Sequence, residues 1–360
     1  MASSVSRGLD TTWLAQGPNG ALDGLVTTRP RDPYFDANAN AWVLTRYADV
    51  LSAFRDIRLL PSVAATDAAR NPRDESGAMI ARREVRDGLT GARLDAWRSR
   101  MDGLADSVLA GVPRDGATST IDLLHDVARP WCMSLGMLVT GSPPNDRPML
   151  ADLGERVFAA TGSPRDSPLR PLAIEAVAEL DRYFDGSPVP LTQQTFIGVS
   201  QTLPRLLASG WLALFSNPDE VGRLRSDPSL GPRAVEELLR YAGIIVHLVR
   251  ASVAELDVGA LHLVPGDRVI LDVASANRDA EQYPEPDRLD VTRLVSGQLT
   301  FGIGRNACIG ARLVRVAYEA GTLALLRRFS SIETVAGRWR LGSGLRWSTE
   351  AHFEVLTAPR

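Results

Sequence analysis

One loop near the C-terminal end, Phe301-Gly302-Ile303-Gly304-Arg305-Asn306-Ala307-Cys308-Ile309-Gly310, constrains the fold more than any other feature of the sequence. Its first two glycines let the backbone turn tightly and approach a flat bound group, because glycine carries no Cβ. Cys308 stands where a helix is predicted to begin, and the helix N-terminus together with Arg305 favours its thiolate form. Gly310 leaves space beside the cysteine. Taken alone, a glycine pair before a cysteine is more simply a loop that leads a buried thiol into a helix.

Apolar residues at helical spacing predict that most of the chain is α-helical. Helices are expected over 47–54, 94–109, 122–139, 172–184, 193–215, 232–241 and 311–329. The segment 193–215 is apolar on nearly all faces, which is typical of a buried central helix. Short strands are expected at 41–44 and over 251–273, where Gly259 and the Pro265-Gly266 pair mark turns. We find no repeat or low-complexity linker, so the sequence predicts one domain over 1–360.

Composition narrows the classes of function. The 360 residues are 44% hydrophobic, which is enough to bury a large core. The net charge of −3 gives no sign of binding to nucleic acid or to an anionic membrane, although every basic residue is an arginine. No run of about 18 apolar residues occurs, so neither a signal peptide nor a membrane-spanning helix is expected. Two distant cysteines, Cys132 and Cys308, favour the reducing cytoplasm over a disulfide framework.

The C-terminal loop resembles the haem-binding signature of the cytochrome P-450 family. The matching positions are Phe301, Gly302, Gly304, Arg305, Cys308 and Gly310. The resemblance implies a fold that is mainly α with a small β region and a b-type haem whose iron is bound by the Cys308 thiolate. Such a ligand pushes electron density onto the iron and favours O–O cleavage. Arg305 is implied to bind a haem propionate, whereas Cys132, in an apolar helix, is interpreted as core packing.

Further upstream, Glu237-Leu238-Leu239-Arg240 places an acid and a base at i and i+3 on one helix face. Such a pair is more often exposed, but it stands in the order and at the distance that the family requires. The resemblance implies that Glu237, Arg240 and Arg288 form a buried charge cluster, and that Arg250 binds the second propionate. Because a buried charge must be paired, removing one partner is expected to cost about 3–5 kcal/mol.

Two departures from the family concern the haem edge and the access side. Arg82 matches a family arginine that binds a propionate, but the histidine expected with it falls near Ala78. One propionate contact is therefore expected to be missing or supplied elsewhere. The chain also has only eight residues, 185–192, between two predicted helices where the family carries a further helix and a loop. The substrate-access side is expected to be open or completed by another chain.

A third departure concerns chemistry. The family's central helix carries an acid followed by a threonine, which relay protons to the oxygen that is being activated. This chain has Gly198-Val199-Ser200-Gln201-Thr202, so the threonine is Thr202 but the acid is Gln201. An amide cannot titrate near neutral pH, and Pro204 is expected to leave the Ser200 carbonyl free and to kink the helix. Either the relay is weakened, or the helix has drifted without functional change.

The resemblance also implies a substrate pocket that includes Gly198, Ile244, Ile245 and His247. The two isoleucines would form an apolar wall. His247 follows the helix of the Glu–Arg pair and would act as an acid, a base or a substrate contact if it faced the pocket. A single histidine in an apolar strand is more often a hydrogen-bonded core residue, and both interpretations stay open.

These features together predict a haem-thiolate oxidoreductase that oxidises a small, largely apolar organic substrate in bacterial specialised metabolism. Its expected partner is a ferredoxin-type electron donor, which would dock on the basic surface of Arg305, Arg312 and Arg315. The alternatives are a haem-thiolate lyase, isomerase or peroxide-driven oxidase, and a non-catalytic haem-binding module, because a fold alone does not decide function.

Overall fold

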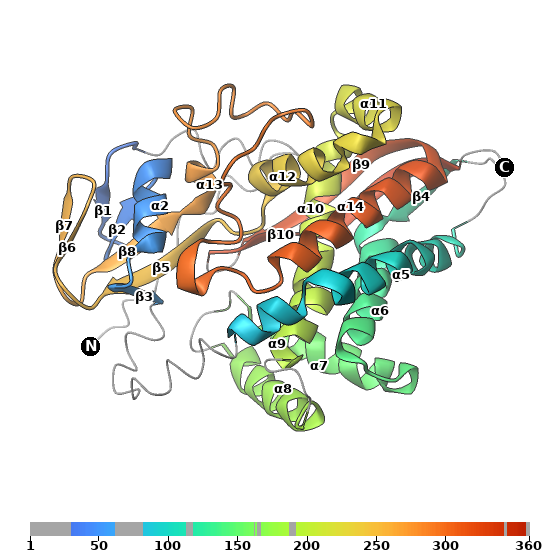
Figure 1. Ribbon diagram of the computed structural model, residues 1–360, viewed down its shortest axis with the longest axis horizontal. Helices are drawn as coiled ribbons and strands as arrows, with labels where there is room; N and C mark the ends of the chain where they lie inside the picture. Colours follow the sequence, from blue (N-terminus) through green and yellow to red (C-terminus); the bar gives the residue numbers. More distant parts are fainter. Residues whose placement is uncertain are drawn as a thin grey trace.

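The computed structural model describes residues 30–61, 82–112, 118–161, 163, 167–186, 192–341 and 344–357. Within these ranges a large helical body adjoins a smaller region of strands at the other end of the long axis (Figure 1). The prediction of a mainly α fold with a small β region is confirmed. Among the described helices, none combines the length and the hydrophobicity needed to cross a membrane.

The helices of the body follow the apolar periodicity of the sequence. The longer ones are α5 (Gly91–Leu109), α6 (Arg129–Thr140), α7 (Arg147–Ala159), α8 (Leu169–Tyr183), α10 (Leu203–Phe215), α11 (Pro218–Ser226), α12 (Gly231–Ala242) and α14 (Ala311–Arg328). The shorter ones are α2 (Tyr47–Arg55), α9 (Thr192–Ile197) and α13 (Val273–Ala276), and residues 82–88 are also helical. Several of these helices have proline in the first turn, where its fixed φ is already helical.

The helix predicted over 122–139 begins later than expected. Asp122 ends strand β4 (Thr118–Asp122), and its side chain accepts hydrogen bonds from the backbone N–H groups of Leu124 and His125. This capping starts a π-helical turn, η2 (Leu123–Ala128), which leads into α6. The apolar spacing of the segment did not reveal the strand, because β4 is too short to show an alternating pattern.

The central helix consists of α9, a π-helical turn η4 (Gly198–Thr202) and α10. In the π turn the Leu203 N–H donates to the Gly198 carbonyl, five residues back. This turn lies immediately before Pro204, whose ring would collide with the backbone of a regular α-helix. The helix is thus irregular beside Pro204, and every residue of α10 is buried, as the sequence predicted.

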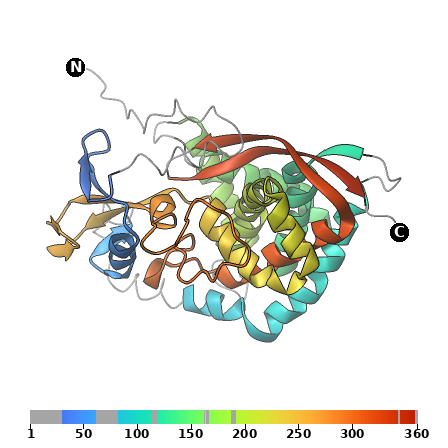
Figure 2. The same cartoon turned by 90° about the horizontal axis from the view of Figure 1, so that it is seen from above.

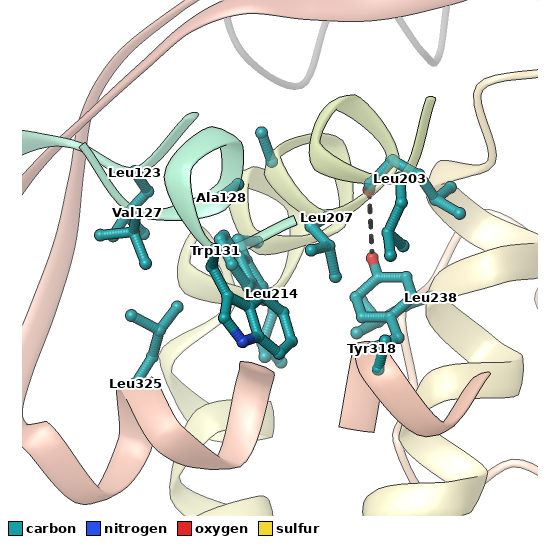
Figure 3. Close-up of a cluster of buried hydrophobic side chains, with 14 of the residues drawn as sticks. Leu123, Val127, Ala128, Trp131, Leu203, Leu207, Leu214, Leu238, Tyr318 and Leu325 are labelled. Atoms are coloured by element: carbon teal, nitrogen blue, oxygen red, sulfur yellow. Dashed lines mark hydrogen bonds between the residues drawn. The ribbon is translucent and has the colours of Figure 1, made fainter. Parts of the chain in front are cut away.

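The core of the body forms where α10 packs between α6 and α14. Figure 3 shows Trp131 of α6, Leu207 of α10 and Tyr318 of α14 converging in this cluster. The Tyr318 hydroxyl donates to the Leu206 carbonyl over 3.4 Å. A Cβ at Gly210 would overlap this hydroxyl, so the glycine lets α10 and α14 approach closely. Each large apolar side chain buried here stabilises the fold by about 1.5–3 kcal/mol.

Three sheets complete the fold. The largest has the order β1-β2-β8-β5-β3, formed by Tyr34–Asp36, Ala41–Leu44, Arg268–Asp272, His247–Ser252 and Leu59–Pro61. Its β2 and β8 strands are parallel, and the other pairs are antiparallel. Strands β6 (Leu256–Val258) and β7 (Leu261–Leu263) form a hairpin. In the third sheet, β4-β10-β9, strands β9 (Phe329–Leu341) and β10 (Arg346–Thr357) run along the helical body (Figure 2).

The segment after α12 connects the helical body to the five-stranded sheet. It meets the connection between β9 and β10, where Ile245 forms an isolated bridge with Leu345 and the Val246 N–H donates to the Gly344 carbonyl over 2.8 Å. This contact fixes the backbone on both sides of Ile244 and Ile245, which sequence analysis assigned to the pocket.

Candidate functional site

An apolar cavity lies between the central helix, the start of α14 and the Cys308 loop. Its walls are formed largely by aliphatic side chains, among them Leu89, Val199, Leu203, Leu206, Ile309, Leu313 and Val314. The site residues predicted from sequence that line it are Gly198, Thr202, Ile244, Ile245, Phe301 and Cys308. A cavity of this kind, apolar with few polar groups, is typical of a site for an organic ligand or cofactor.

The Cys308 loop has the geometry that its glycines predict. Gly302 and Gly304 have φ of 63° and 78°, in the left-handed region that side-chain-bearing residues rarely adopt. The Cys308 N–H donates to the Phe301 carbonyl over 2.8 Å, which closes the loop immediately before α14. A Cβ at Gly310 would lie 4.0 Å from the Cys308 Sγ, which is an ordinary contact, so the glycine is not needed to avoid a clash with the thiol. Gly310 lines the cavity, and the missing side chain leaves more room there.

The Cys308 side chain is exposed at the cavity, but the surrounding protein removes most of the water from its thiol. It opens into the cavity, and burial raises the pKa of its thiol above the ordinary value. The Gly310 backbone N–H and the charges of Arg82 and Arg315 act in the opposite direction. The sequence pointed to Arg305 as the nearby cation, whereas the arginines whose charges act on this thiol are Arg82 and Arg315. Cys132, in contrast, is fully buried in the core cluster.

Arginines gather on another side of Cys308. A second, smaller cavity that also reaches Cys308 is lined by Arg82, Arg83, Arg86 and Arg305. One Arg82 Nη donates to the Ala307 carbonyl over 2.7 Å, which ties the 82–88 helix to the thiolate loop. Two of the three arginines predicted to bind propionates therefore lie beside the cysteine. Ala78, where the family's histidine was expected, lies outside the described residues.

Arg250, the third predicted propionate ligand, is buried on β5. Its guanidinium lies 5.9 Å from the centre of the Phe54 ring, and a Cβ at Gly302 would touch the same ring at 3.4 Å. Among the described residues, no carboxylate lies within 4.0 Å of this guanidinium, and its Nη1 donates to the Val249 carbonyl. Burial lowers the pKa of Arg250. A buried cation without a counter-ion is suited to an anionic group of a bound cofactor.

The Glu237 cluster is present, with one correction. Glu237 and Arg240 are buried and joined by two hydrogen bonds, of 2.7 and 2.8 Å. The prediction that Arg288 completes the cluster is wrong: its side chain is 51% exposed and pairs with Glu285 and Asp290. Arg293 takes this position instead, with its Nε 3.1 Å from the Glu237 Oε1. Arg288 contributes only its backbone carbonyl, at 3.4 Å from Arg240.

Thr202 and Gln201 are adjacent in the π turn, but their side chains lie in different surroundings. Thr202 lines the cavity, whereas Gln201 is absent from its lining and is buried toward α7. A Cβ at Gly154 of α7 would lie 2.6 Å from the Gln201 Nε2. Arg205 donates to the Gln201 backbone carbonyl over 2.6 Å and lies 3.3 Å from its side-chain oxygen. Gln201, which stands in place of the family's relay acid, therefore does not line this cavity, because its amide packs against α7.

Behind Gln201, charged residues continue toward the surface. Arg205 stacks 3.8 Å from the centre of the Phe158 ring and lies 3.5 Å from the Glu155 carboxylate. Glu155 also pairs with Arg129 and is 40% exposed. Burial lowers the pKa of Arg205 to about 10, with Arg129 acting in the same direction and Glu155 opposing it. This group anchors the π turn to α7.

His247 lies at the start of β5 and is not among the residues that line the cavity. Its backbone N–H is 3.2 Å from the Gly344 carbonyl, next to the connection between β9 and β10. His247 therefore does not belong to the wall of this cavity, and its role as a pocket residue or as a packed residue stays a prediction. Ile244 and Ile245, three and two residues earlier, do form the expected apolar wall.

Sequence reasoning missed several residues that the structure places at the site. Gln194 and Thr195 line the cavity one turn before Gly198. Arg315, which was predicted as part of a docking surface, instead pairs with Glu236 and lies 4.8 Å from the centre of the Phe301 ring. The i+7 spacing of Thr195 and Thr202 was the one available signal for the polar lining, because it places both on nearly the same helical face.

The arrangement fits a haem. A porphyrin is flat and apolar with two carboxylates at one edge, and the cavity is apolar, reaches a cysteine thiol and has arginines nearby. The uncompensated burial of Arg250 is the most specific sign, because nothing among the described residues balances its charge. No group of three or more metal-ligating side chains occurs in the described part of the chain. Cys308, whose thiol opens into the cavity, is the site's candidate metal ligand.

Comparisons with known proteins agree with this geometry. The sequence pattern of the family described as Cytochrome P450 matches residues 230–336. The chain is 32% identical over 361 residues to vitamin D(3) 25-hydroxylase of Pseudonocardia autotrophica, covering 89% of this chain and 87% of the relative. It is 27% identical to nocardicin C N-oxygenase of Nocardia uniformis subsp. tsuyamanensis, over 89% of this chain and 90% of the relative. The crystal structure of cytochrome P450 CYP109B1 from Bacillus subtilis superposes with a TM-score of 0.80 at 21% identity, covering 94% of this chain and 99% of that one.

Proposed function

Because the chain belongs to the cytochrome P450 family of haem-thiolate oxidoreductases, we propose that it is a single-domain monooxygenase of bacterial specialised metabolism that oxidises a small, largely apolar molecule. The apolar walls of the cavity support an apolar substrate. The relatives named above, a vitamin D(3) hydroxylase and a nocardicin C oxygenase, support an oxygenase reaction. Two free cysteines are compatible with a cytoplasmic setting, which we include in the proposal.

The cofactor is haem bound through a cysteine thiolate. When bound, it supplies one-electron and O₂ chemistry. We assign Cys308 as the axial ligand and Arg82, Arg250 and Arg305 as the propionate-binding residues. Phe301 and Gly302 would pack beside the cofactor, and the Glu237, Arg240 and Arg293 cluster would hold the segment that precedes the loop. The single observation that carries this assignment is that the Cys308 thiol opens into an apolar cavity.

Protein groups at the cavity would orient the substrate and control protons. Ile244, Ile245 and Val199 exclude water from the reacting centre, which strengthens the few polar interactions there. Thr202 is the hydroxyl on the π turn that faces this space, so we assign it the role of holding a proton-donating hydrogen bond to the reacting oxygen. Gln201 would serve this role only indirectly, by bracing the π turn.

The assignment of Cys308 is tested with two matched cysteine variants. Cys308→Ala should abolish the thiolate-type spectrum of the reduced, carbon-monoxide-bound protein. Cys132→Ala removes a thiol of the core cluster and should leave that spectrum unchanged. Loss of the spectrum in Cys132→Ala alone would show that the ligand is misassigned.

One observation favours a second candidate, a peroxide-driven oxidase or an isomerase. Among the described residues that line the cavity there is no carboxylic acid, and the Gln201 amide points elsewhere. Reactions that need no protons delivered from the protein would not require one. Product formation from peroxide, or without oxygen and reductant, would favour this candidate, whereas strict dependence on oxygen and an electron donor would favour the monooxygenase.

A ferredoxin-type electron donor is the expected partner of the monooxygenase. The surface beside the thiolate loop carries the exposed Arg83, Arg86 and Arg312. Arg83 and Arg86 share one exposed carboxylate, that of Asp87, at 3.7 and 3.8 Å, so the surface keeps an excess of positive charge that suits an acidic protein. Arg315, predicted to belong to this surface, is instead engaged by Glu236 and Phe301. We therefore propose a docking surface of Arg83, Arg86, Arg305 and Arg312.

A further inference from the structure

Thr195 is a buried hydroxyl in the wall of the apolar cavity. The residue is 7% exposed and lines the cavity, and its Oγ1 has no hydrogen-bond partner among the residues that the structure describes. Burying a hydroxyl without a partner is unfavourable, because its hydrogen bonds to water are lost and not replaced. A polar atom in this situation indicates a site that is completed by a ligand or by ordered water.

Other helical hydroxyls of this protein satisfy themselves locally. Ser134, Thr140, Ser209 and Thr322 each donate to the backbone carbonyl four residues earlier, over 2.8–3.0 Å. Among the described residues the Thr195 hydroxyl has no such acceptor, so it stays available to the cavity. Thr300, another threonine of the lining, is already engaged, because it donates to the Leu239 carbonyl over 2.7 Å and lies 3.1 Å from the Asn277 amide.

The position of Thr195 along the central helix sets the distance between the two ends of the cavity wall, at Thr195 and at Thr202. Thr195 and Thr202 both line the cavity and are seven residues apart, which corresponds to about 10 Å along a helix axis. Gln194, next to Thr195, also lines the cavity and is exposed, so the polar end of the cavity is near solvent. Between the two threonines the cavity wall consists of Gly198 and Val199, which offer no polar side chain.

We propose that Thr195 is a specificity-determining residue that binds a hydroxyl or carbonyl oxygen of the substrate. The substrate is then a largely apolar molecule with one such oxygen about 10 Å from the atom that is oxidised. The Thr195 hydroxyl can donate to either oxygen and can accept from a hydroxyl. Gln194 supplies a second, adaptable contact at the same end. This inference rests on the proposed function, since it takes the Thr202 end of the cavity as the reacting end.

The test uses the haem-loaded full chain and a series of 1-alkylimidazoles, whose ring nitrogen binds haem iron and fixes one end of the ligand. Each chain length is compared as a pair, one ligand ending in a methyl group and the other in a hydroxyl. Dissociation constants are measured from the change in the haem spectrum. The advantage of the hydroxyl should be greatest at roughly eight methylene groups, the length that spans about 10 Å.

Three variants separate the hydroxyl from the rest of the side chain. Thr195→Val should reduce the hydroxyl/methyl affinity ratio about 3- to 10-fold, the range of one hydrogen bond, whereas Thr195→Ser should retain it. Ser200→Ala is the matched control, because the Ser200 Oγ is also buried and unpartnered but the residue does not line the cavity. It should leave the ratio unchanged.

Two results would overturn the inference in different ways. If the thiolate-type spectrum is normal but Thr195→Val leaves the ratio unchanged at every chain length, Thr195 does not bind the ligand's oxygen and the proposed function stands. If the protein shows no thiolate-type carbon-monoxide spectrum, the proposed function fails and this inference fails with it.

Discussion

At the scale of single residues, Glu237 is a fully buried acid on which the segment before the thiolate loop depends. Its carboxylate is fully buried and receives hydrogen bonds from Arg240, from Arg293 and from the Asp290 backbone N–H at 3.0 Å. A buried charge is tolerated only with such complete pairing. The cluster joins α12 to the chain segment that leads to the thiolate loop, so its integrity supports the cofactor site.

Removing the Glu237 charge should therefore be costly. Glu237→Gln is expected to lower the free energy of unfolding by about 3–5 kcal/mol, because Arg240 and Arg293 lose their counter-ion. Urea unfolding of the haem-loaded protein measures this loss, and haem content reports its effect on the site.

Arg293, the observed third residue of the Glu237 cluster, and Arg288, the one predicted from sequence, provide a matched comparison. Arg293→Ala should cost about 1–3 kcal/mol, because one hydrogen-bonded charge is lost while Arg240 remains. Arg288→Ala should change stability by no more than about 0.5 kcal/mol, because that side chain is half exposed. Equal losses in the two variants would contradict the assignment of Arg293 to the cluster.

The arginine of this cluster could not be chosen from sequence. Arg288 and Arg293 are five residues apart in an irregular segment, where no helical or strand period relates side-chain directions. Glu237 and Arg240 could be paired in advance, because three residues along a helix always share a face. The same contrast applies to Gln201. Its position on the central helix was predictable, but it lies in a π turn, where side chains do not point in the directions that α-helical spacing predicts. The direction of its side chain was therefore not predictable.

At the scale of elements, the contact between α7 and the π turn decides what Gln201 does. Gly154 is buried inside α7, and a Cβ there would lie 2.6 Å from the Gln201 amide nitrogen and 3.2 Å from its carbon. Gln201 has little room to move, because it is 4% exposed and Arg205 holds its carbonyl. Glycine inside a helix is otherwise unfavourable, so its presence here reflects this close approach.

A double-mutant cycle tests this orientation without any assumption about catalysis. Gly154→Ala alone should destabilise the protein by about 1–3 kcal/mol through overpacking. In a Gln201→Ala background the space is free, and the same change should stabilise by about 0.5–1 kcal/mol, the helix preference for alanine. Thermal or urea unfolding of the four proteins gives the coupling energy. Additive effects of the two changes would show that Gln201 does not face α7.

The long periodic helices were predicted, as were the short strand β2 and the short helix α2, whereas β4, β9 and β10 were missed. Helices α5, α8, α12 and α14 lie within a few residues of their expected bounds, because their apolar stripes extend over several turns. Strands β9 and β10 received no prediction although they are long. Bulges at Ser348/Glu350 and His352/Phe353 shift the pairing register of these two strands. The shifts interrupt the alternation of exposed and buried residues that would identify a strand in the sequence.

At the scale of the whole molecule, charge is distributed unevenly. The net charge is −3, yet arginines gather where the 82–88 helix meets the thiolate loop and the start of α14, and Arg83 and Arg86 share the single carboxylate of Asp87. The net value therefore says little about the local potential that a partner meets. Clustered charges of one sign accelerate the encounter with an oppositely charged protein, and salt weakens this effect within a Debye length of about 8–10 Å.

This distribution predicts how electron delivery should depend on salt and on individual arginines. The second-order rate of reduction by an acidic ferredoxin should fall as ionic strength rises, and the double change Arg86→Gln with Arg312→Gln should lower it roughly tenfold at low salt. Both side chains are exposed, and neither belongs to the Glu237 cluster, so stability and the carbon-monoxide spectrum should stay unchanged. Arg327→Gln is the control, because Arg327 is an exposed arginine at the far end of α14, about 20 Å along the helix from Arg312. Stopped-flow reduction measures the rates. If Arg327→Gln slows reduction as much as the double variant does, the effect is one of net charge, and the proposed docking surface is wrong.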